Sequence, residues 1–197
     1  RTHAHTHTHT RTHTHAHTHT HTHHGRPSSL KTQPEKELDT VLASFSGGER
    51  KPGAEGGPAC LMEHGLQQQI QKSSWKTSVE DPLFGQLFEK QKSEDASDFH
   101  GKTKRPGLVG EATGLIYDNA KKIADRGGFV LTLGGGHSVS VASVSAVLSK
   151  YPDAGLLWID AHADINTAST AYSGNSYGCP ISFLLQRGLQ KPGTWLL

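Results

Sequence analysis

The spacing of apolar residues predicts alternating helices and strands in the second half of the chain. Residues 107–126 carry apolar side chains at intervals of three and four, which predicts an amphipathic helix ended by Gly127. Residues 129–133 (FVLTL) form a short apolar run that predicts a buried strand. Residues 138–149 predict a second helix, and residues 156–159 (LLWI) predict a second buried strand.

Weaker patterns extend this arrangement toward both ends. Residues 40–43 predict a short strand, and residues 59–71 predict a helix that follows Pro58. The polar residues 73–106 predict a long loop with a short strand or helix, and residues 180–189 predict a last helix. Strands separated by segments of helical length favour an α/β fold with a parallel sheet.

The N-terminal segment has a different composition. The first 24 residues alternate threonine and histidine with few interruptions, and none of their side chains offers apolar surface beyond alanine. Such a segment cannot offset the entropy of ordering, so we expect a disordered tail over residues 1–38 and a folded domain over residues 39–197. Two interpretations stay open: a His-rich metal-binding module, or a translated ACACAC repeat that reads Thr-His.

Charge and cysteine content narrow the classes of partner. The first 26 residues hold three arginines and no acid, so the remainder has 17 basic and 18 acidic side chains, a net charge of −1. A near-neutral body argues against binding to nucleic acid or to anionic membranes. No apolar run is long enough to span a bilayer. Two cysteines far apart in the sequence favour a reducing, cytoplasmic setting.

Chemically active side chains follow both predicted strands of the second half. His137 comes after residues 129–133 and three glycines, and Asp160, His162 and Asp164 come directly after residues 156–159. The carboxyl ends of parallel strands meet at one edge of the sheet, where sites form.

The spacing of these side chains suits divalent metal ions. Alternate residues of an extended segment lie about 6.5 to 7 Å apart, too far for one ion. The spacing therefore favours two ions that share a carboxylate, or a segment that curls. Two carboxylates and two imidazoles suit an ion such as Mn²⁺, which would acidify a bound water.

For two residues near this motif we expect structural roles. Trp158 belongs to the predicted strand 156–159, so we expect it in the core. Cys179 has no neighbour in sequence that would activate a thiolate, so we expect an unreactive small residue before Pro180.

Four segments resemble arginase, of the ureohydrolase family, and its fungal members in particular. They lie within residues 40–189 and read VLASFSGGERKPGAEGGP (41–58), LVGEATGLIYDNAKKI (108–123), LTLGGGHS (131–138) and SAVLSKYPDAGLLWIDAHADINT (145–167). The resemblance implies an α/β/α domain with an eight-stranded parallel sheet, usually in trimers. It also implies two Mn²⁺ ions and the hydrolysis of L-arginine to L-ornithine and urea.

The resemblance assigns roles to individual residues. His137 and His162 would be terminal ligands of the two manganese ions, and Asp160 would bridge both. Asp164 would bind the same ion as His137.

Three other positions depart from the arginase pattern, while two match it. Asn166 and Ser173 match residues that hydrogen-bond the substrate α-carboxylate. Gly136 replaces the aspartate of the family motif Gly-Gly-Asp-His, and Ala171 replaces a threonine that contacts the carboxylate. Tyr177 occupies the position of a proton-shuttling histidine, and a phenol is poorly matched to proton transfer at neutral pH.

The chain ends at Leu197, before the Asp-Val-Asp strand that supplies the remaining metal carboxylates in arginases. We therefore expect the N-terminal half of the three-layer fold, with weak activity or none, and no trimer. The alternatives are a non-catalytic truncated fragment or pseudogene product, and a His-rich metal-binding module. Agmatinase, a sister enzyme, fits less well because of Asn166 and Ser173.

Overall fold

The computed structural model describes residues 36–82, 87, 99–100 and 102–187. The chain divides into two units, Arg1–Gln33 and Pro34–Leu197, and all described residues belong to the second. The tail predicted over residues 1–38 therefore falls largely outside the described part, although its last two residues already belong to the first strand.

The elements follow one another in the order strand, helix pair, strands, long helix, strand and two further helices. They are β1 (Glu37–Ala43), η1 (Ala54–Gly56), α1 (Gly57–Glu63), α2 (Leu66–Lys72), β2 (Lys76–Glu80), β3 (Phe99–His100), β4 (Thr103–Lys104), α3 (Pro106–Asp125), β5 (Phe129–Gly134), η3 (His137–Val139), α4 (Ser140–Lys150), η4 (Ser176–Gly178) and α5 (Pro180–Arg187). Here η denotes a 3₁₀ helix.

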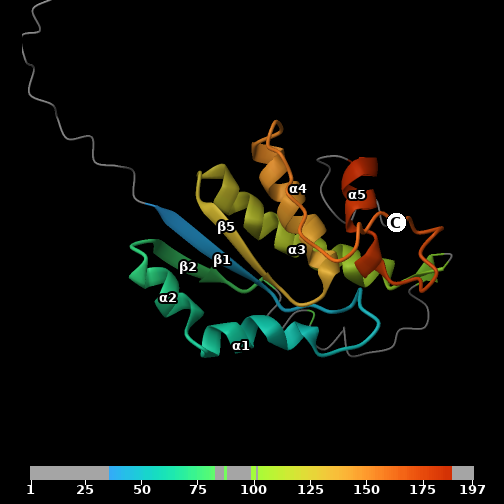
Figure 1. Cartoon of the computed structure of the whole chain (residues 1–197), viewed down its shortest axis with the longest axis horizontal. Coiled ribbons are helices and arrows are strands. Elements are labelled where there is room, and N and C mark those ends of the chain that lie inside the picture. The colour runs from blue at the N-terminus through green and yellow to red at the C-terminus, as the bar shows by residue number, and fades with distance from the viewer. Residues whose placement is uncertain (1–35, 83–86, 88–98, 101, 188–197) are drawn as a thin grey trace, which may run out of the picture. The chain divides into compact units, whose positions relative to one another are not determined.

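Three strands form a parallel sheet in the order β2-β1-β5, with β1 in the middle (Figure 1). The register pairs Leu38 with Phe129 and Ala43 with Gly134, so β1 and β5 end at the same edge. A separate antiparallel pair joins β3 to β4. This arrangement confirms the predicted α/β class with a parallel sheet.

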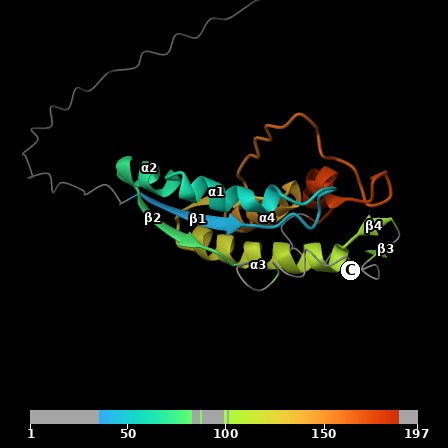
Figure 2. The ribbon, with the colours of Figure 1, turned by 90° about the horizontal axis from the view of Figure 1, so that it is seen from below.

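Helices cover both faces of the sheet (Figure 2). Helices α1 and α2 lie on one face and α3 lies on the other, and α4 packs against α3. The core is made mainly of residues from β1, α3 and α4. Its central members are Val41, Ala43, Phe45, Val109, Ala112, Ile116, Ala120, Ile123, Val141, Ala142 and Ala146.

The long helix α3 forms as its sequence predicts. Pro106 occupies the first turn, where its missing N–H costs nothing. The buried positions recur at intervals of three and four along one face, against the sheet and α4. Gly127 follows the helix with φ of 82°, a conformation that a glycine adopts without strain. The helix thus runs one residue earlier than predicted, over Pro106–Asp125.

Most of the other predicted elements are also present. The strand predicted over 129–133 is β5, and the strand predicted over 40–43 is the second half of β1. The helix predicted over 138–149 is α4 with η3 before it. The helix predicted over 180–189 corresponds to α5, whose last two predicted residues lie outside the described part.

Three sequence predictions are wrong. Residues 156–159 form no strand, and Leu157 and Ile159 are 83% and 87% exposed. Trp158 is therefore half-buried outside the sheet and not a core strand residue. The helix predicted over 59–71 is broken at Gly65, whose φ is 87°.

The segment 73–106 agrees with its prediction as a long loop with a short strand or helix. It contains the strand β2, which pairs with β1 along five residues. The strand sequence KTSVE has one large apolar residue, so its apolar pattern is faint.

None of the helices in the described part of the chain is long and apolar enough to cross a lipid bilayer.

Candidate metal centre

His137 lies just beyond the carboxyl end of β5, at the start of η3. The chain reaches it through Gly135 and Gly136, which run against the backbone that follows β1. The Gly135 N–H donates to the carbonyl of Ala43 at 3.0 Å, and the Gly136 N–H donates to that of Phe45 at 2.6 Å. A Cβ on Gly135 would lie 2.5 Å from the Phe45 carbonyl oxygen, so the close approach requires a glycine.

His137, Asp160 and Asp164 form a group of three possible metal ligands. Their ligand atoms all lie within 4.8 Å of one another. His137 Nδ1 is 3.7 Å from Asp160 Oδ2 and 3.4 Å from Asp164 Oδ2. The sequence predicted this convergence, and it occurs although residues 156–159 form no strand.

The donor set fits a divalent ion. First-row metal ions bind nitrogen and oxygen ligands at about 2.1 Å, so two ligands of one ion lie about 3 to 4.2 Å apart. The two printed separations from His137 Nδ1 fall in this range. One imidazole and two carboxylates suit Mn²⁺ better than an ion that prefers thiolates.

Asp160 is held by a local turn. Its Oδ1 accepts the backbone N–H of His162 at 2.9 Å. This hydrogen bond is the main reason that the pKa of Asp160 lies below its usual value, and the nearby imidazoles of His137 and His162 lower it further. The carboxylate is therefore ionised, as a metal ligand must be.

Asp164 is the buried member of the group. Its backbone lies in the left-handed region with φ of 50°, where aspartate is several-fold enriched among residues other than glycine. The indole Nε1 of Trp158 donates to Asp164 Oδ2 at 3.2 Å. The same indole stacks on the His137 ring. Trp158 thus contacts two of the three candidate ligands, a role that its apolar surroundings in the sequence did not reveal.

His162 lies at the margin of the group. Its side chain is 82% exposed, and its Nδ1 is 3.6 Å from Asp160 Oδ1. The two oxygens of Asp160 therefore face different imidazoles, Oδ2 toward His137 and Oδ1 toward His162.

The residues predicted to bind or process the substrate follow in the next loop and η4. Asn166 and Ser173 are exposed, and the Asn166 N–H donates to the Gly178 carbonyl at 3.1 Å. Tyr177 is half-buried in η4, and its N–H donates to the Gly48 carbonyl at 3.3 Å. Helices η3 and η4 are in contact, so the segment of Tyr177 packs beside that of His137.

Cys179 is not a candidate nucleophile. The side chain is 2% exposed, and its burial raises the thiol pKa to about 11, with a further contribution from the charge of Asp164. The thiol is therefore neutral at physiological pH, as its sequence context predicted.

Glu49 also belongs to the site, although no motif in the sequence pointed to it. Its Oε1 accepts the backbone N–H of His137 at 2.7 Å. The two residues are 88 positions apart, and only the parallel pairing of β1 with β5 brings them together.

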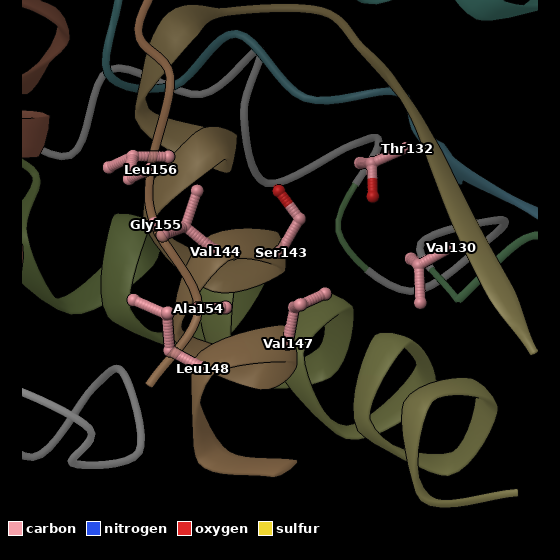
Figure 3. A pocket seen from close by; sticks show the side chains of 9 residues that line it. All are labelled: Val130, Thr132, Ser143, Val144, Val147, Leu148, Ala154, Gly155 and Leu156. Carbon is pink, nitrogen blue, oxygen red and sulfur yellow. The ribbon is translucent and has the colours of Figure 1, made fainter. Parts of the chain in front are cut away.

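A shallow hollow of about 290 Å³ lies apart from this group, with walls from β5, α4 and the segment 154–156 (Figure 3). It is lined by Val130, Thr132, Ser143, Val144, Val147, Leu148, Ala154, Gly155 and Leu156. The wall is mostly apolar and carries no ionisable side chain, so it does not suit a cation.

Comparison with known proteins gives the family. The family model "Arginase family" matches residues 38–196. This chain belongs to the arginase family. Its resemblance to the fungal members, seen first in the sequence motifs, is confirmed by curated relatives.

Two fungal relatives show the extent of the match. The chain is 50% identical over 165 residues to the arginase of Saccharomyces cerevisiae, which covers 79% of this chain and 49% of that protein. It is 46% identical over 168 residues to the arginase of Eremothecium gossypii, and this match covers 85% of this chain and 41% of that protein. The chain thus spans less than half the length of these arginase-family relatives.

Solved structures agree with the fold. The cold-adapted arginase of the yeast Glaciozyma antarctica is 31% identical, with a TM-score of 0.58, over 83% of this chain and 50% of that chain. The arginase of Bacillus caldovelox gives a TM-score of 0.65, and the match covers 81% of this chain and 53% of that chain. At 24% identity this second match supports the arginase-like fold alone.

Proposed function

We propose that this arginase-family chain binds Mn²⁺ at His137, Asp160 and Asp164, and that the site serves the hydrolysis of L-arginine to L-ornithine and urea. The observation that carries the proposal is the convergence of these three side chains at the carboxyl edge of a parallel sheet. Family membership supports arginine as the substrate. Because the chain spans less than half of its relatives' length, the complete reaction is part of the proposal.

A second ion is proposed between Asp160 and His162. Its support is the geometry of the Asp160 carboxylate, whose two oxygens face His137 and His162 at 3.7 and 3.6 Å. When bound, divalent manganese supplies Lewis acidity toward water and the guanidinium group.

The substrate side of the site is assigned to the loop that follows. Asn166 and Ser173 are exposed, as contacts for an incoming α-carboxylate must be. Tyr177 is proposed at the proton-transfer position, and a phenol exchanges protons poorly at neutral pH. We therefore expect slow turnover by this chain, and a chain that binds metal without turnover is the alternative.

The remaining partner assignments follow from charge and cysteine content. Cys60 and Cys179 are both free thiols, which supports a reducing, cytoplasmic setting. The near-neutral body supports a small-molecule substrate over nucleic acid or a membrane surface.

Urea release tests the reaction. Purified chain is assayed with L-arginine, with and without Mn²⁺, beside the variants His137→Ala and Asp164→Asn. We expect slow, Mn²⁺-dependent release that both variants abolish. Release that is independent of metal, or that survives both substitutions, would contradict the proposal. Retained Mn²⁺ binding with no release would favour the non-catalytic alternative.

A further inference from the structure

The carboxylate of Glu49 holds the backbone of a candidate metal ligand. Glu49 Oε1 accepts the N–H of His137 at 2.7 Å, a short distance typical of a hydrogen bond to a charged acceptor. The His137 N–H is the first of η3, where no helical carbonyl is in reach. The side chain of Glu49 therefore caps η3 and fixes the residue that carries the imidazole.

Glu49 also occupies the space beside Gly136. A Cβ built on Gly136 would lie 2.6 Å from Glu49 Cγ and 2.8 Å from Glu49 Oε1. Contacts this short are not tolerated by real side chains. A residue larger than glycine at position 136 would thus push the carboxylate away from the His137 N–H.

The backbone position of Glu49 is fixed by hydrogen bonds in the turn that follows β1. The Glu49 N–H donates to the Ser46 carbonyl at 2.9 Å, and Ser46 Oγ donates to Glu55 Oε2 at 2.5 Å. The Gly136 N–H donates to the Phe45 carbonyl at 2.6 Å, which ties the same turn to the end of β5. These bonds fix the backbone that carries Glu49 relative to the end of β5, so the carboxylate starts from a defined position beside His137.

We propose that Glu49 is a positioning residue for His137. We also propose that Glu49 and Gly136 form a pair, because the Glu49 carboxylate can reach the His137 N–H only if position 136 carries no side chain. The consequence for metal affinity rests on the metal site proposed above. The pair also gives a physical reason for Gly136, where the arginase motif has an aspartate. Partners that orient a metal ligand typically contribute 10- to 100-fold to affinity.

The first test needs no metal. Amide hydrogen exchange at His137 is followed by NMR in the ¹⁵N-labelled full chain and in the variants Glu49→Ala and Glu49→Gln. We expect exchange to be at least about ten-fold faster in Glu49→Ala, and within about three-fold of the original in Glu49→Gln, which keeps an acceptor oxygen. Unchanged exchange in Glu49→Ala would overturn the proposal.

The second test is a double-mutant cycle on Mn²⁺ affinity, with Glu49→Ala, Gly136→Ala and the double variant. We expect Glu49→Ala and Gly136→Ala each to weaken binding about 10- to 100-fold. In the Glu49→Ala background the additional Gly136→Ala change should cost less than about two-fold, because the collision is gone. Independent, additive losses would overturn the pairing. Circular dichroism of each variant verifies folding.

The two tests separate the inference from the proposed function. If Mn²⁺ binding by the full chain is unaffected by His137→Ala, the proposed metal site fails. The exchange measurement, with melting temperatures of the same four proteins, then still decides the inference. Coupled melting temperatures with faster exchange in Glu49→Ala would support it, and additive melting temperatures with unchanged exchange would overturn it.

Discussion

The indole of Trp158 stacks on the imidazole of His137, with ring centroids 5.1 Å apart and planes inclined by 23°. The same indole donates its N–H to the carboxylate of Asp164. One half-buried side chain thus holds two candidate metal ligands in place and covers one side of the group. Orientation of ligands in this way raises metal affinity.

Replacement of Trp158 should weaken metal binding in two steps. Trp158→Phe keeps an aromatic ring against His137 but loses the hydrogen bond to Asp164, so Mn²⁺ affinity should fall by roughly three- to ten-fold. Trp158→Ala loses both contacts and should cost about 10- to 100-fold. Calorimetric titration measures both. Affinity unchanged in Trp158→Ala would show that the stacking does not support the site.

A buried carboxylate at the opposite end of the sheet should contribute to stability. Asp39 is 5% exposed and accepts hydrogen bonds from Ser78 Oγ at 2.6 Å, Ser78 N at 3.2 Å and Arg126 at 2.5 Å. Asp39→Ala leaves these donors without their acceptor, and should lower the free energy of unfolding by about 1–3 kcal/mol. Urea denaturation monitored by circular dichroism gives the value.

The exposed ion pair of Lys121 with Asp125 is the matched control. Its nitrogen–oxygen distance is 2.7 Å, but both side chains are more than a third exposed. Lys121→Ala should therefore change the stability far less than Asp39→Ala does, because solvent screens an exposed ion pair. Equal effects of Lys121→Ala and Asp39→Ala would mean that burial of Asp39 does not strengthen its interactions.

The two cysteines should differ in reactivity. Cys60 is exposed, whereas Cys179 is buried with its pKa raised to about 11. At pH 8 a thiol reagent should label Cys60 within minutes and Cys179 only after denaturation. Rapid labelling of both in the native chain would contradict the packing around Cys179.

The same pKa shift predicts how stability depends on pH. In the unfolded chain the Cys179 thiol ionises near its usual pKa of 9.0, while in the folded chain it keeps its proton to about 11. The folded state binds more protons in this window, so stability falls as pH rises through it. Cys179→Ala should reduce this alkaline loss in denaturation curves at pH 8 and 10, and an unchanged slope would contradict the shift.

Tyr177 offers a gain-of-function test. A chimera joins residues 38–187 of this chain to the C-terminal part of the Saccharomyces cerevisiae arginase. In this chimera Tyr177→His should raise urea release by about ten- to a thousand-fold, the usual range for a residue in acid–base catalysis. The variant Tyr177→Phe is the control and should give no gain. An equal rate for all three proteins would exclude a proton-transfer role at this position.

Local patterns in the sequence predicted the elements whose partners are close in the chain. The apolar stripe of α3 and the flanking Pro106 and Gly127 define that helix almost to the residue. Residues 129–133 gave β5, and the glycines after it placed His137 at the sheet edge. These features depend on the spacing of apolar residues and on the backbone preferences of proline and glycine, both of which can be read from a short stretch of sequence.

The remaining features depend on partners distant in the chain. Residues 156–159 are apolar enough for a strand, but a strand needs a neighbour, and within the described residues β5 pairs only with β1. A short strand or helix was expected within residues 73–106, but the bounds of β2 could not be predicted, because it pairs through backbone groups while its side chains are mostly polar. The contact of Glu49 with His137 joins residues 88 positions apart, and no local sequence pattern predicts it.

The central claim is that His137, Asp160 and Asp164 hold a divalent manganese ion. The direct measurement is Mn²⁺ titration, followed by electron paramagnetic resonance, of a chain that lacks residues 1–35 and hence the eleven histidines of the tail. We expect saturable binding that weakens at least about 100-fold in both His137→Ala and Asp164→Asn, and by far less in the exposed variant His64→Ala. Binding that is absent, or that is equal in all four proteins, would contradict it.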